Sequence, residues 1–223
     1  MITYEHFLKE GVYDPNIFKA VFMAGGPGSG KSFIAGKTTG GLGLKIINSD
    51  SAFERYLKKE GLSLKMPDSE TTGRDVERDR AKKVTEKKKY LAIRGRLGII
   101  IDGTGHKYDK VADQASMLQQ LGYETSMVFV NTSLEVALHR NEKRPRSVKP
   151  ALVKKSWKDV QNNMGKFQNY FGASNFFIAD NNGFEEDMLE ISTKHIRRAI
   201  SSPVKNVIAK AWIADEMKKK RRT

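Results

Sequence analysis

Five short, mostly apolar runs recur along the chain, and longer stretches of mixed polarity separate them. The runs are Ala20–Ala24, Leu44–Ile47, Leu97–Ile101, Ser126–Val130 and Phe176–Ala179. Near-continuous apolar runs of this length are typical of parallel strands that are covered on both faces. We therefore expect five buried strands that form one mainly parallel sheet.

Segments with helical periodicity fill the intervals between these runs. They are Lys31–Thr38, Ser51–Glu60, Asp75–Arg94, Tyr108–Leu121, Ser133–Asn141, Ala151–Tyr170 and Glu185–Ala199. Strands that alternate with helices predict a three-layer α/β fold with helices on both faces of the sheet. The length of 223 residues suits one such domain, which we place at residues 1–200.

Two segments fall outside this alternation. Residues Gly61–Gly73, with Pro67 among them, are expected to form a loop or a mobile insertion. Residues 201–223 are expected to form a basic helix or tail, with a helix over Pro203–Lys220 and a free basic end. The apolar face of that helix would pack on the domain and would comprise Val204, Val207, Ile208, Ala211, Trp212 and Met217.

The chain is strongly basic, with 40 Lys and Arg residues against 26 Asp and Glu residues and a net charge of +14. Basic residues are densest in Arg74–Arg96 and in the final stretch Lys218–Arg222. Charge of this kind favours polyanionic partners, nucleic acid above all. The alternative is an ordinary solvated helix face and tail, and an enzyme that handles ATP also needs positive charge.

Composition argues against several other classes of protein. No apolar run approaches the roughly 18 residues that a membrane span needs, so we expect no membrane partner. The N-terminal residues carry acids and lack the apolar core of a secretory signal. Cysteine is absent, which excludes disulfides and cysteine-ligated metals. These features predict a cytoplasmic protein, and they leave the oligomeric state open.

The sequence GGPGSGKS, residues Gly25–Ser32, directly follows the first apolar run. It matches the motif G-x-x-x-x-G-K-[ST], whose backbone N–H groups surround the phosphates of a nucleotide. Lys31 is expected to reach the β and γ phosphates, and the Ser32 hydroxyl to bind Mg²⁺. The motif predicts a nucleotide, which we take to be ATP, and Mg²⁺ as cofactors. The predicted nucleotide-binding residues are Gly25, Gly26, Pro27, Gly28, Ser29, Gly30, Lys31, Ser32 and Phe33.

Two other expected strands end in a carboxylate. Asp102 follows Leu97–Ile101 and is expected to lie beside the phosphate loop as a Mg²⁺ ligand, although a strand-end aspartate can also cap the next turn. Asp50 follows Leu44–Ile47 and is placed to accept the proton of an attacking hydroxyl. Alternatively, Asp50 caps the helix that starts near Ser51.

The residues Asp102–Gly105 also match the D-x-x-G motif of GTPase switches. The guanine-reading motif N-K-x-D does not occur in the chain, which argues against a switch GTPase. Motor and AAA+ ATPases usually have longer domains and use an arginine from a neighbouring subunit, and nothing in the sequence requires that arrangement.

A stretch between two expected helices supplies the cations that phosphoryl transfer needs. Arg140 lies at a helix end, and Arg144 and Arg146 follow shortly after it. Such cations stabilise a transition state that spreads negative charge over the transferred group. We predict that residues 141–150 form the lid of a kinase and that these arginines act in catalysis. The alternative is a charged loop between helices.

Four stretches give the chain a family resemblance: GGPGSGKS, IINSDSAF, IIIDGTGHKYDK and QASMLQQLGYETSMVFVNTS. Over about Val21–Pro150 they resemble the zeta-toxin and polynucleotide-kinase-like branch of P-loop kinases. The chain also resembles predicted kinases of tailed phages, and if a phage encodes it, the expected location is the cytoplasm of the host. The resemblance implies that Lys31 and Ser32 serve the nucleotide and Mg²⁺, and that Asp50 is the catalytic base. It also implies that Arg140 and Arg146 match two lid arginines.

The resemblance is weaker among the residues that are expected to contact the acceptor. Asp102 and Thr104 match an acid and a threonine that zeta toxins use around a sugar-nucleotide substrate, but that acid is glutamate in zeta toxins. His106 stands where an arginine is expected, and its alternative role is that of an exposed loop histidine. We expect Asp50 to face the substrate together with these three residues, and the chemistry to carry over better than the identity of the acceptor.

These features together predict a kinase that depends on ATP and Mg²⁺ and phosphorylates a hydroxyl group. The preferred acceptor lies on nucleic acid and is either a polynucleotide end or a hydroxymethylated base in phage DNA. One alternative is a zeta-toxin-like kinase of UDP-N-acetylglucosamine or another free nucleotide. Another is a nucleic-acid-binding ATPase without an acceptor.

Overall fold

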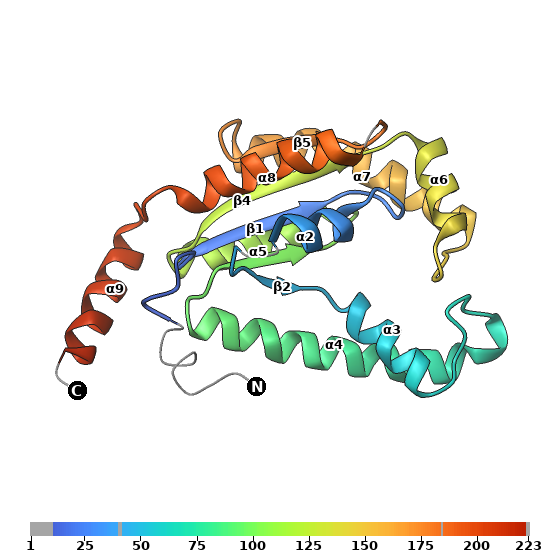
Figure 1. Ribbon diagram of the computed structural model, residues 1–223, viewed down its shortest axis with the longest axis horizontal. Coiled ribbons are helices and arrows are strands. Elements are labelled where there is room, and N and C mark those ends of the chain that lie inside the picture. Colours follow the sequence, from blue (N-terminus) through green and yellow to red (C-terminus); the bar gives the residue numbers. More distant parts are fainter. Residues whose placement is uncertain (1–10, 40–41, 184, 222–223) are drawn as a thin grey trace.

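The computed structural model describes residues 11–39, 42–183 and 185–221. In this part of the chain five strands form one sheet in the order β2-β3-β1-β4-β5, and every neighbouring pair is parallel. All five expected strands are present, and the α/β fold is confirmed (Figure 1). The strands are β1 (Lys19–Ala24), β2 (Lys45–Ile47), β3 (Ile99–Asp102), β4 (Glu124–Asn131) and β5 (Phe176–Asp180).

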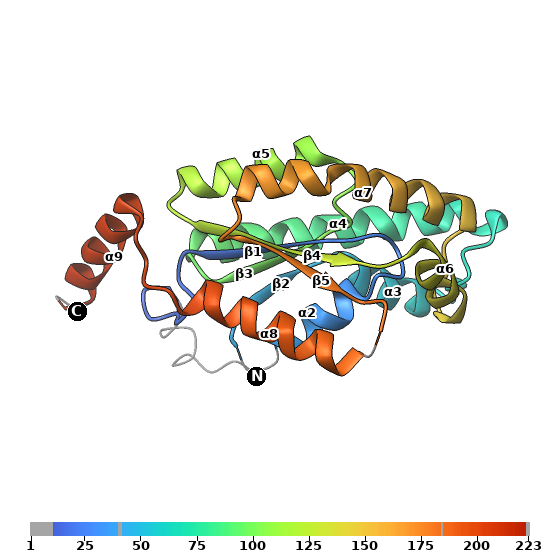
Figure 2. The ribbon, with the colours of Figure 1, turned by 90° about the horizontal axis from the view of Figure 1, so that it is seen from above.

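Helices cover both faces of the sheet, as a three-layer fold requires. Helices α5 and α7 pack on one face, and α2 and α8 pack on the other (Figure 2). The helices are α2 (Lys31–Thr39), α3 (Asp50–Lys59), α4 (Thr71–Arg94), α5 (Tyr108–Gln120), α6 (Leu134–Lys143), α7 (Pro150–Phe171), α8 (Glu185–Ser201) and α9 (Val207–Lys220), with a short 3-10 helix η1 (Asp68–Glu70).

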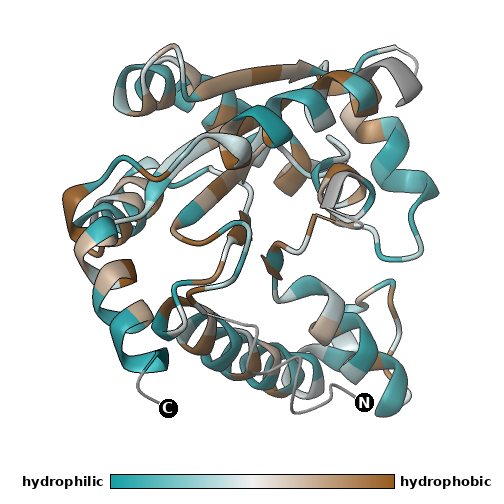
Figure 3. Cartoon of the chain, turned by 60° about the vertical axis from the view of Figure 1, so that its left-hand side comes forward, coloured by the Kyte–Doolittle hydropathy of each residue, from teal (hydrophilic) through white to brown (hydrophobic). Residues whose placement is uncertain are grey.

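The central strand β1 contributes to both hydrophobic cores, and all of its residues are buried. Phe22 and its neighbours two positions away face the core beneath α5 and α7, whereas Val21 and Met23 face the core beneath α2 and α8. This division follows from the alternation of side chains along a strand. Hydrophobic colouring is accordingly prominent on the strands, and much of the surface of the outer helices is hydrophilic (Figure 3).

A third, smaller apolar cluster joins α3 to α4 away from the sheet. Its buried members are Phe53, Leu57 and Ala81. The segment predicted as a loop or mobile insertion packs against this cluster through side chains at its start, including Leu62. That segment is a loop only as far as residue 67, because η1 and the first turn of α4 occupy the rest of it.

Helix α4 therefore begins at Thr71, four residues before the predicted start at Asp75. The earlier start has a local cause. The Thr71 hydroxyl donates to the carbonyl of Asp68 at 2.7 Å, and the Arg74 guanidinium donates to the carbonyl of Met66 at 3.0 Å. These contacts tie the preceding turn to the helix and offset the weak helix propensity of threonine and glycine.

The C-terminal helix α9 begins at Val207 rather than at Pro203, since the Asn206 side chain accepts the N–H of Ile208 at 2.9 Å and caps it. The predicted packing face is partly wrong. Val207 and Ile208 are 78% and 54% exposed, whereas Ala209 is fully buried against the core and Trp212 packs beside it. The face is rotated because Trp212 meets the ring of Phe18 edge to face, with 5.5 Å between centroids.

Across the described ranges, no helix is both long enough and apolar enough to span a membrane.

The assignment of the core can be tested on α5, where two neighbouring residues differ in burial. Leu118 is fully buried and Met117 is 43% exposed. We expect Leu118→Ala to lower the free energy of unfolding by about 2–5 kcal/mol, because it removes packing and leaves a cavity. Met117→Ala, the matched control, should change it by less than about 0.5 kcal/mol. Urea denaturation measures both, and equal losses would contradict this core.

Candidate active site

The loop between β1 and α2, residues 25–30, wraps tightly and needs glycine at specific positions. Gly28 and Gly30 have φ angles of 82° and 90°, which residues with a Cβ rarely adopt. A Cβ at Gly28 would lie 2.2 Å from the carbonyl oxygen of Ala137, and one at Gly30 would lie 2.4 Å from Asn181 Nδ2. Neither position admits a side chain, so the motif glycines are required by the packing as well as by the turn.

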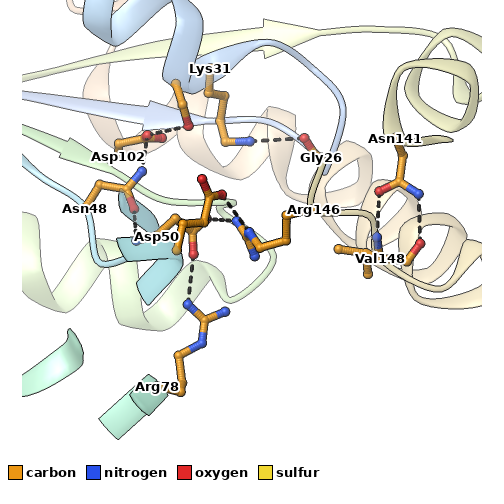
Figure 4. A network of polar contacts seen from close by, with 11 residues as sticks. Gly26, Lys31, Asn48, Asp50, Arg78, Asp102, Asn141, Arg146 and Val148 are labelled. Carbon is orange, nitrogen blue, oxygen red and sulfur yellow. Dashed lines mark hydrogen bonds and ion pairs between the residues drawn. The ribbon is translucent and has the colours of Figure 1, made fainter. Parts of the chain in front are cut away.

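Lys31 begins α2 and is folded back onto this loop. Its ammonium donates to the carbonyl of Gly26 at 3.0 Å (Figure 4). It also donates to the Ser29 hydroxyl at 3.3 Å. Burial lowers the pKa of this ammonium; the nearby Asp102 carboxylate opposes the shift and the Arg144 guanidinium adds to it. An anionic phosphate in the loop would offer Lys31 a stronger, charge-assisted partner than these neutral oxygens.

Aromatic side chains lie beside the loop. Trp157 of α7 lies next to Gly26: a Cβ added at Gly26 would be 3.5 Å from the Trp157 Cα. The Trp157 indole donates to the carbonyl of Thr132 at 2.8 Å. Phe33 projects from α2 with 40% exposure, and the Lys37 ammonium lies 5.9 Å from its ring centre. Phe33 therefore has free ring surface near the phosphate loop.

Ser32 and Asp102 form the candidate metal site. The Ser32 hydroxyl donates to the Asp102 carboxylate at 2.9 Å, and the Asn48 amide donates to the same carboxylate oxygen (Figure 4). Hard oxygen donors of this kind suit Mg²⁺, which is usually held by one or two protein ligands together with waters and phosphates. The part of the chain that the structure describes has no cluster of three or more acidic, His or Cys side chains that would make an all-protein site.

Asp50 is the first residue of α3, and Ser49 occupies the capping position. The Asp50 carboxylate bridges two arginines: it pairs with Arg78 Nη1 at 2.8 Å through Oδ1 and with Arg146 Nη2 at 2.8 Å through Oδ2 (Figure 4). The helix-cap alternative for Asp50 is therefore wrong, because its carboxylate is bound to side chains from α4 and from the segment between α6 and α7.

These two ion pairs set the charge of Asp50. Burial alone would raise the pKa of its carboxyl, but the guanidiniums of Arg146 and Arg78 outweigh burial and hold that pKa below its ordinary value. A carboxyl whose pKa falls on folding stabilises the fold at neutral pH, and that contribution is lost as the pH falls through the lowered value. Asp50 becomes a stronger base only when a guanidinium leaves it.

The connection between α6 and α7 carries two of the three predicted arginines. Its ends are joined by Asn141, which donates to the carbonyl of Val148 at 2.7 Å and accepts the N–H of Val148 at 3.0 Å. Within this closed loop Arg146 is buried and also pairs with Glu54 of α3 at 2.8 Å. Arg144 is exposed, and its guanidinium makes no ion pair with any described residue.

Arg140 points elsewhere. Its guanidinium donates to the carbonyl of Asn181 just after β5 at 3.0 Å, and the Asn181 amide donates to the carbonyl of Ser29 at 2.7 Å. Arg140 thus reaches the phosphate loop through Asn181, from the side opposite Asp50. Arg146 is the arginine that the structure brings to the predicted base, and the roles of Arg140 and Arg144 in charge neutralisation stay predictions.

The turn after β3 is fastened to the phosphate loop. The Thr104 carbonyl accepts the N–H of Gly25 at 3.0 Å, and the Thr104 hydroxyl shares a 2.5 Å hydrogen bond with His106 Nδ1. Asn163 of α7 donates to the carbonyls of Gly105 and His106, both at 3.1 Å. Thr104 and His106 are therefore held beside the loop, where the predicted acceptor would lie.

A pocket of about 370 Å³ opens beside Asp102. Its volume lies in the range of small-molecule sites. The residues after β2 and β3 form its floor, and α4 and α5 form its walls. Its polar lining residues include Asn48, Ser49, Asp102, Thr104, His106, Lys107, Thr85, Glu86, Lys89, Lys110 and Gln114.

Four contributors to this site were not predicted from the sequence: Asn48, Arg78, Asn163 and Asn181. Arg78 lies in the basic stretch that we associated with polyanions, but nothing in that stretch separates it from its neighbours. Asn48 and Asn181 each follow a strand, a position that parallel α/β folds use for ligand contacts. That positional signal could have identified both asparagines.

The family model described as an AAA domain matches residues 21–166 of the 223. A search of curated proteins by sequence finds no match. Among solved structures, a gluconokinase from Sinorhizobium meliloti is 13% identical with a TM-score of 0.50, and the match covers 83% of this chain and 95% of that one. The PezAT toxin–antitoxin system of Streptococcus pneumoniae gives 17% identity and a TM-score of 0.50, with 82% and 88% covered.

A chain of the Pnkp1/Rnl/Hen1 RNA repair complex is 21% identical with a TM-score of 0.52, and the match covers 68% of this chain and 47% of that one. At these identities the three structures establish a shared fold and leave the activity open. The same fold thus occurs in a gluconokinase, in a toxin–antitoxin system and in an RNA repair complex.

The role of the loop glycines can be tested with a matched pair. Gly28→Ala places a Cβ against the Ala137 carbonyl at a positive φ, so we expect nucleotide affinity to fall by roughly tenfold or more. Gly165→Ala, in an exposed turn of α7 with nothing within 4 Å, should leave affinity unchanged and raise the free energy of unfolding by about 0.5–1 kcal/mol. Calorimetric titration with ATP measures the first effect. Unchanged affinity in folded Gly28→Ala protein would contradict the site.

Proposed function

The chain belongs to the AAA domain family, and from that membership and the site we propose that it is a kinase that transfers the γ-phosphoryl group of ATP to a hydroxyl group. The observation that carries this proposal is the position of Asp50. Its carboxylate lies at the same sheet edge as Lys31 and Asp102, yet it is bound by arginines and is separate from the Ser32–Asp102 pair. A pure ATPase has no need for such a carboxylate.

In the proposed reaction the acceptor oxygen bonds to the γ-phosphorus while the bond between that phosphorus and the β–γ bridging oxygen breaks. ADP leaves, and the hydroxyl proton passes to the carboxylate of Asp50. Lys31 and the N–H groups of the loop would hold the phosphates of the nucleotide. The pocket beside Asp102 would hold the acceptor.

Arg146 links the base to the lid. A γ-phosphate would compete with Asp50 and Glu54 for this guanidinium, because phosphate is a strong bidentate partner for arginine. When Arg146 turns to the phosphate, the pKa of the Asp50 carboxyl rises towards its ordinary value and the carboxylate becomes a better base. Arg78 would remain to position it. Nucleotide binding and activation of the base are thereby coupled.

Mg²⁺ fits the same site. Ser32 and Asp102 would hold it, and when bound it would supply positive charge that offsets the negative charge of the nucleotide phosphates.

The acceptor hydroxyl in this proposal lies on nucleic acid, as a polynucleotide end or a hydroxymethylated base in phage DNA. The net charge of +14 supports a polyanionic substrate. The side of α4 that faces the site also supports it, because Arg78 pairs with Asp50 and Lys89 lines the pocket beside Asp102.

Two other functions rest on particular observations. The pocket of about 370 Å³ and the Thr104–His106 contact beside it favour a free nucleotide such as a UDP-sugar as acceptor. A nucleic-acid-binding ATPase without an acceptor would use the same phosphate loop and the same net positive charge of +14.

Asp50→Asn separates these functions. Asparagine is nearly isosteric but cannot take a proton, so we expect phosphoryl transfer to fall by roughly 10²–10⁴-fold while nucleotide affinity changes little. Transfer of labelled γ-phosphate and calorimetric titration with ATP measure the two effects. The matched control is Asp79→Asn on α4, whose exposed pair with Lys82 contributes little, so its transfer rate should stay near that of the unaltered protein.

An unchanged rate of phosphoryl transfer in Asp50→Asn would show that Asp50 is not the base. Its ion pairs with Arg78 and Arg146 would then have only a structural role. Loss of ATP binding in a folded variant would instead make Asp50 a nucleotide or metal ligand, and the proposed base would have to be abandoned.

A further inference from the structure

The pocket beside Asp102 has lysines on its walls that the proposed phosphoryl transfer does not use. We propose that Lys107 and Lys110 bind a phosphate group of the acceptor, so that the acceptor is a hydroxyl compound that already carries phosphate. This inference rests on the proposed kinase function and names the substrate class of the same site. It concerns a phosphate distinct from those held by Lys31.

The charges that line the pocket do not cancel. Lys89 of α4 is paired with Glu86 at 2.6 Å, and Asp102 is engaged by Ser32 and Asn48. Both pocket carboxylates are therefore satisfied. Two ammonium groups remain, and in the described part of the chain neither forms an ion pair.

The unpaired lysines are Lys107, which precedes α5, and Lys110 in its first turn. Both affect the same imidazole. Burial lowers the pKa of His106, and the charges of Lys107, Lys110 and Lys155 lower it further, while Asp159 of α7 opposes them. Lys107 and Lys110 are therefore both close enough to His106 for their charges to act on the same ring. The neutral imidazole at pH 7 adds no positive charge of its own.

The pocket is lined both by residues next to the predicted base and by the two unpaired lysines, so it could contact two functional groups of one acceptor. Asn48 and Ser49 line it immediately before Asp50, and Asp102 and Thr104 line it beside the phosphate loop. An acceptor hydroxyl beside Asn48 and Ser49 would lie next to the predicted base, Asp50. Lys107 and Lys110 line the same pocket from the start of α5, where a second functional group of the same molecule would contact them.

Two neighbouring ammonium groups suit a phosphate better than a single carboxylate. Each brings three donors, and phosphate offers more acceptor oxygens and up to two negative charges. The phosphate could belong to a free nucleotide or sugar phosphate, or to the first internucleotide linkage of a polynucleotide. Both sources share the same chemistry, and the length of the acceptor distinguishes them.

Binding measurements test this without relying on transfer. With a non-hydrolysable ATP analogue and Mg²⁺ saturating the phosphate loop, calorimetry compares thymidine, thymidine 3′-phosphate and a thymidine oligonucleotide with a free 5′-hydroxyl. We expect each phosphate-bearing probe to bind roughly tenfold or more tightly than thymidine. In the double variant Lys107→Ala/Lys110→Ala that advantage should disappear, and thymidine affinity should stay unchanged.

The control Lys58→Ala/Lys59→Ala removes the same charge from the exposed end of α3, and it should retain the preference for phosphate. Tighter binding of the oligonucleotide than of thymidine 3′-phosphate would support the proposal and assign the polynucleotide source; equal binding would support it and assign the free nucleotide. Equal binding of thymidine and its phosphate, or an undiminished preference in the pocket double variant, would overturn it.

The two proposals can fail separately. If the protein binds the phosphate probes through these lysines but transfers no phosphate from ATP to any of them, the phosphate-binding pocket is supported and the proposed kinase function is wrong. Gluconate serves as the carboxylate probe. If it bound as tightly as thymidine 3′-phosphate, and with the same dependence on Lys107 and Lys110, the assignment to phosphate would be wrong.

Discussion

The candidate site depends on one carboxylate held between two guanidiniums. Asp50 connects three segments that are distant in sequence: the start of α3, the middle of α4 through Arg78, and the connection between α6 and α7 through Arg146. Because the Arg146 side chain is only 8% exposed, breaking its pairs without offering a replacement would leave a charge with little access to water. The segment between α6 and α7 is therefore held over the site until another anion can take Arg146, and the proposed γ-phosphate is such an anion.

The parallel sheet explains why these groups meet. The carboxyl ends of β1, β2 and β3 share one edge, so the residues that follow them converge there whatever their separation in sequence. The phosphate loop follows β1, Asp50 follows β2, and Asp102 ends β3. The glycines let the loop approach Ala137 and Asn181 closely, and Asn163 fixes the turn after β3 against it. The site is thus built from loops on a rigid sheet.

The features predicted from the sequence were those that local pattern determines. Buried parallel strands leave short apolar runs, so the five strands were found, and a phosphate loop has a defined motif around Lys31 and Ser32. The features that were missed depend on tertiary contacts. The early start of α4 depends on Arg74 reaching back to Met66, and the rotation of α9 depends on Trp212 meeting Phe18. The pairing of Arg78 with Asp50 joins two helices, and no spacing rule identifies it among the many cations of α4.

The central claim is that the chain passes phosphate to a hydroxyl rather than to water. The most direct measurement follows labelled γ-phosphate from ATP with Mg²⁺ in the presence of an acceptor panel: hydroxyl-ended DNA and RNA, hydroxymethylated DNA, free nucleotides and UDP-sugars. A kinase should place label on at least one hydroxyl acceptor, and adding that acceptor should reduce the share of label released as inorganic phosphate. Release of inorganic phosphate alone, at a rate that none of these acceptors changes, would instead identify the protein as a nucleotide hydrolase and rule out the proposed transfer.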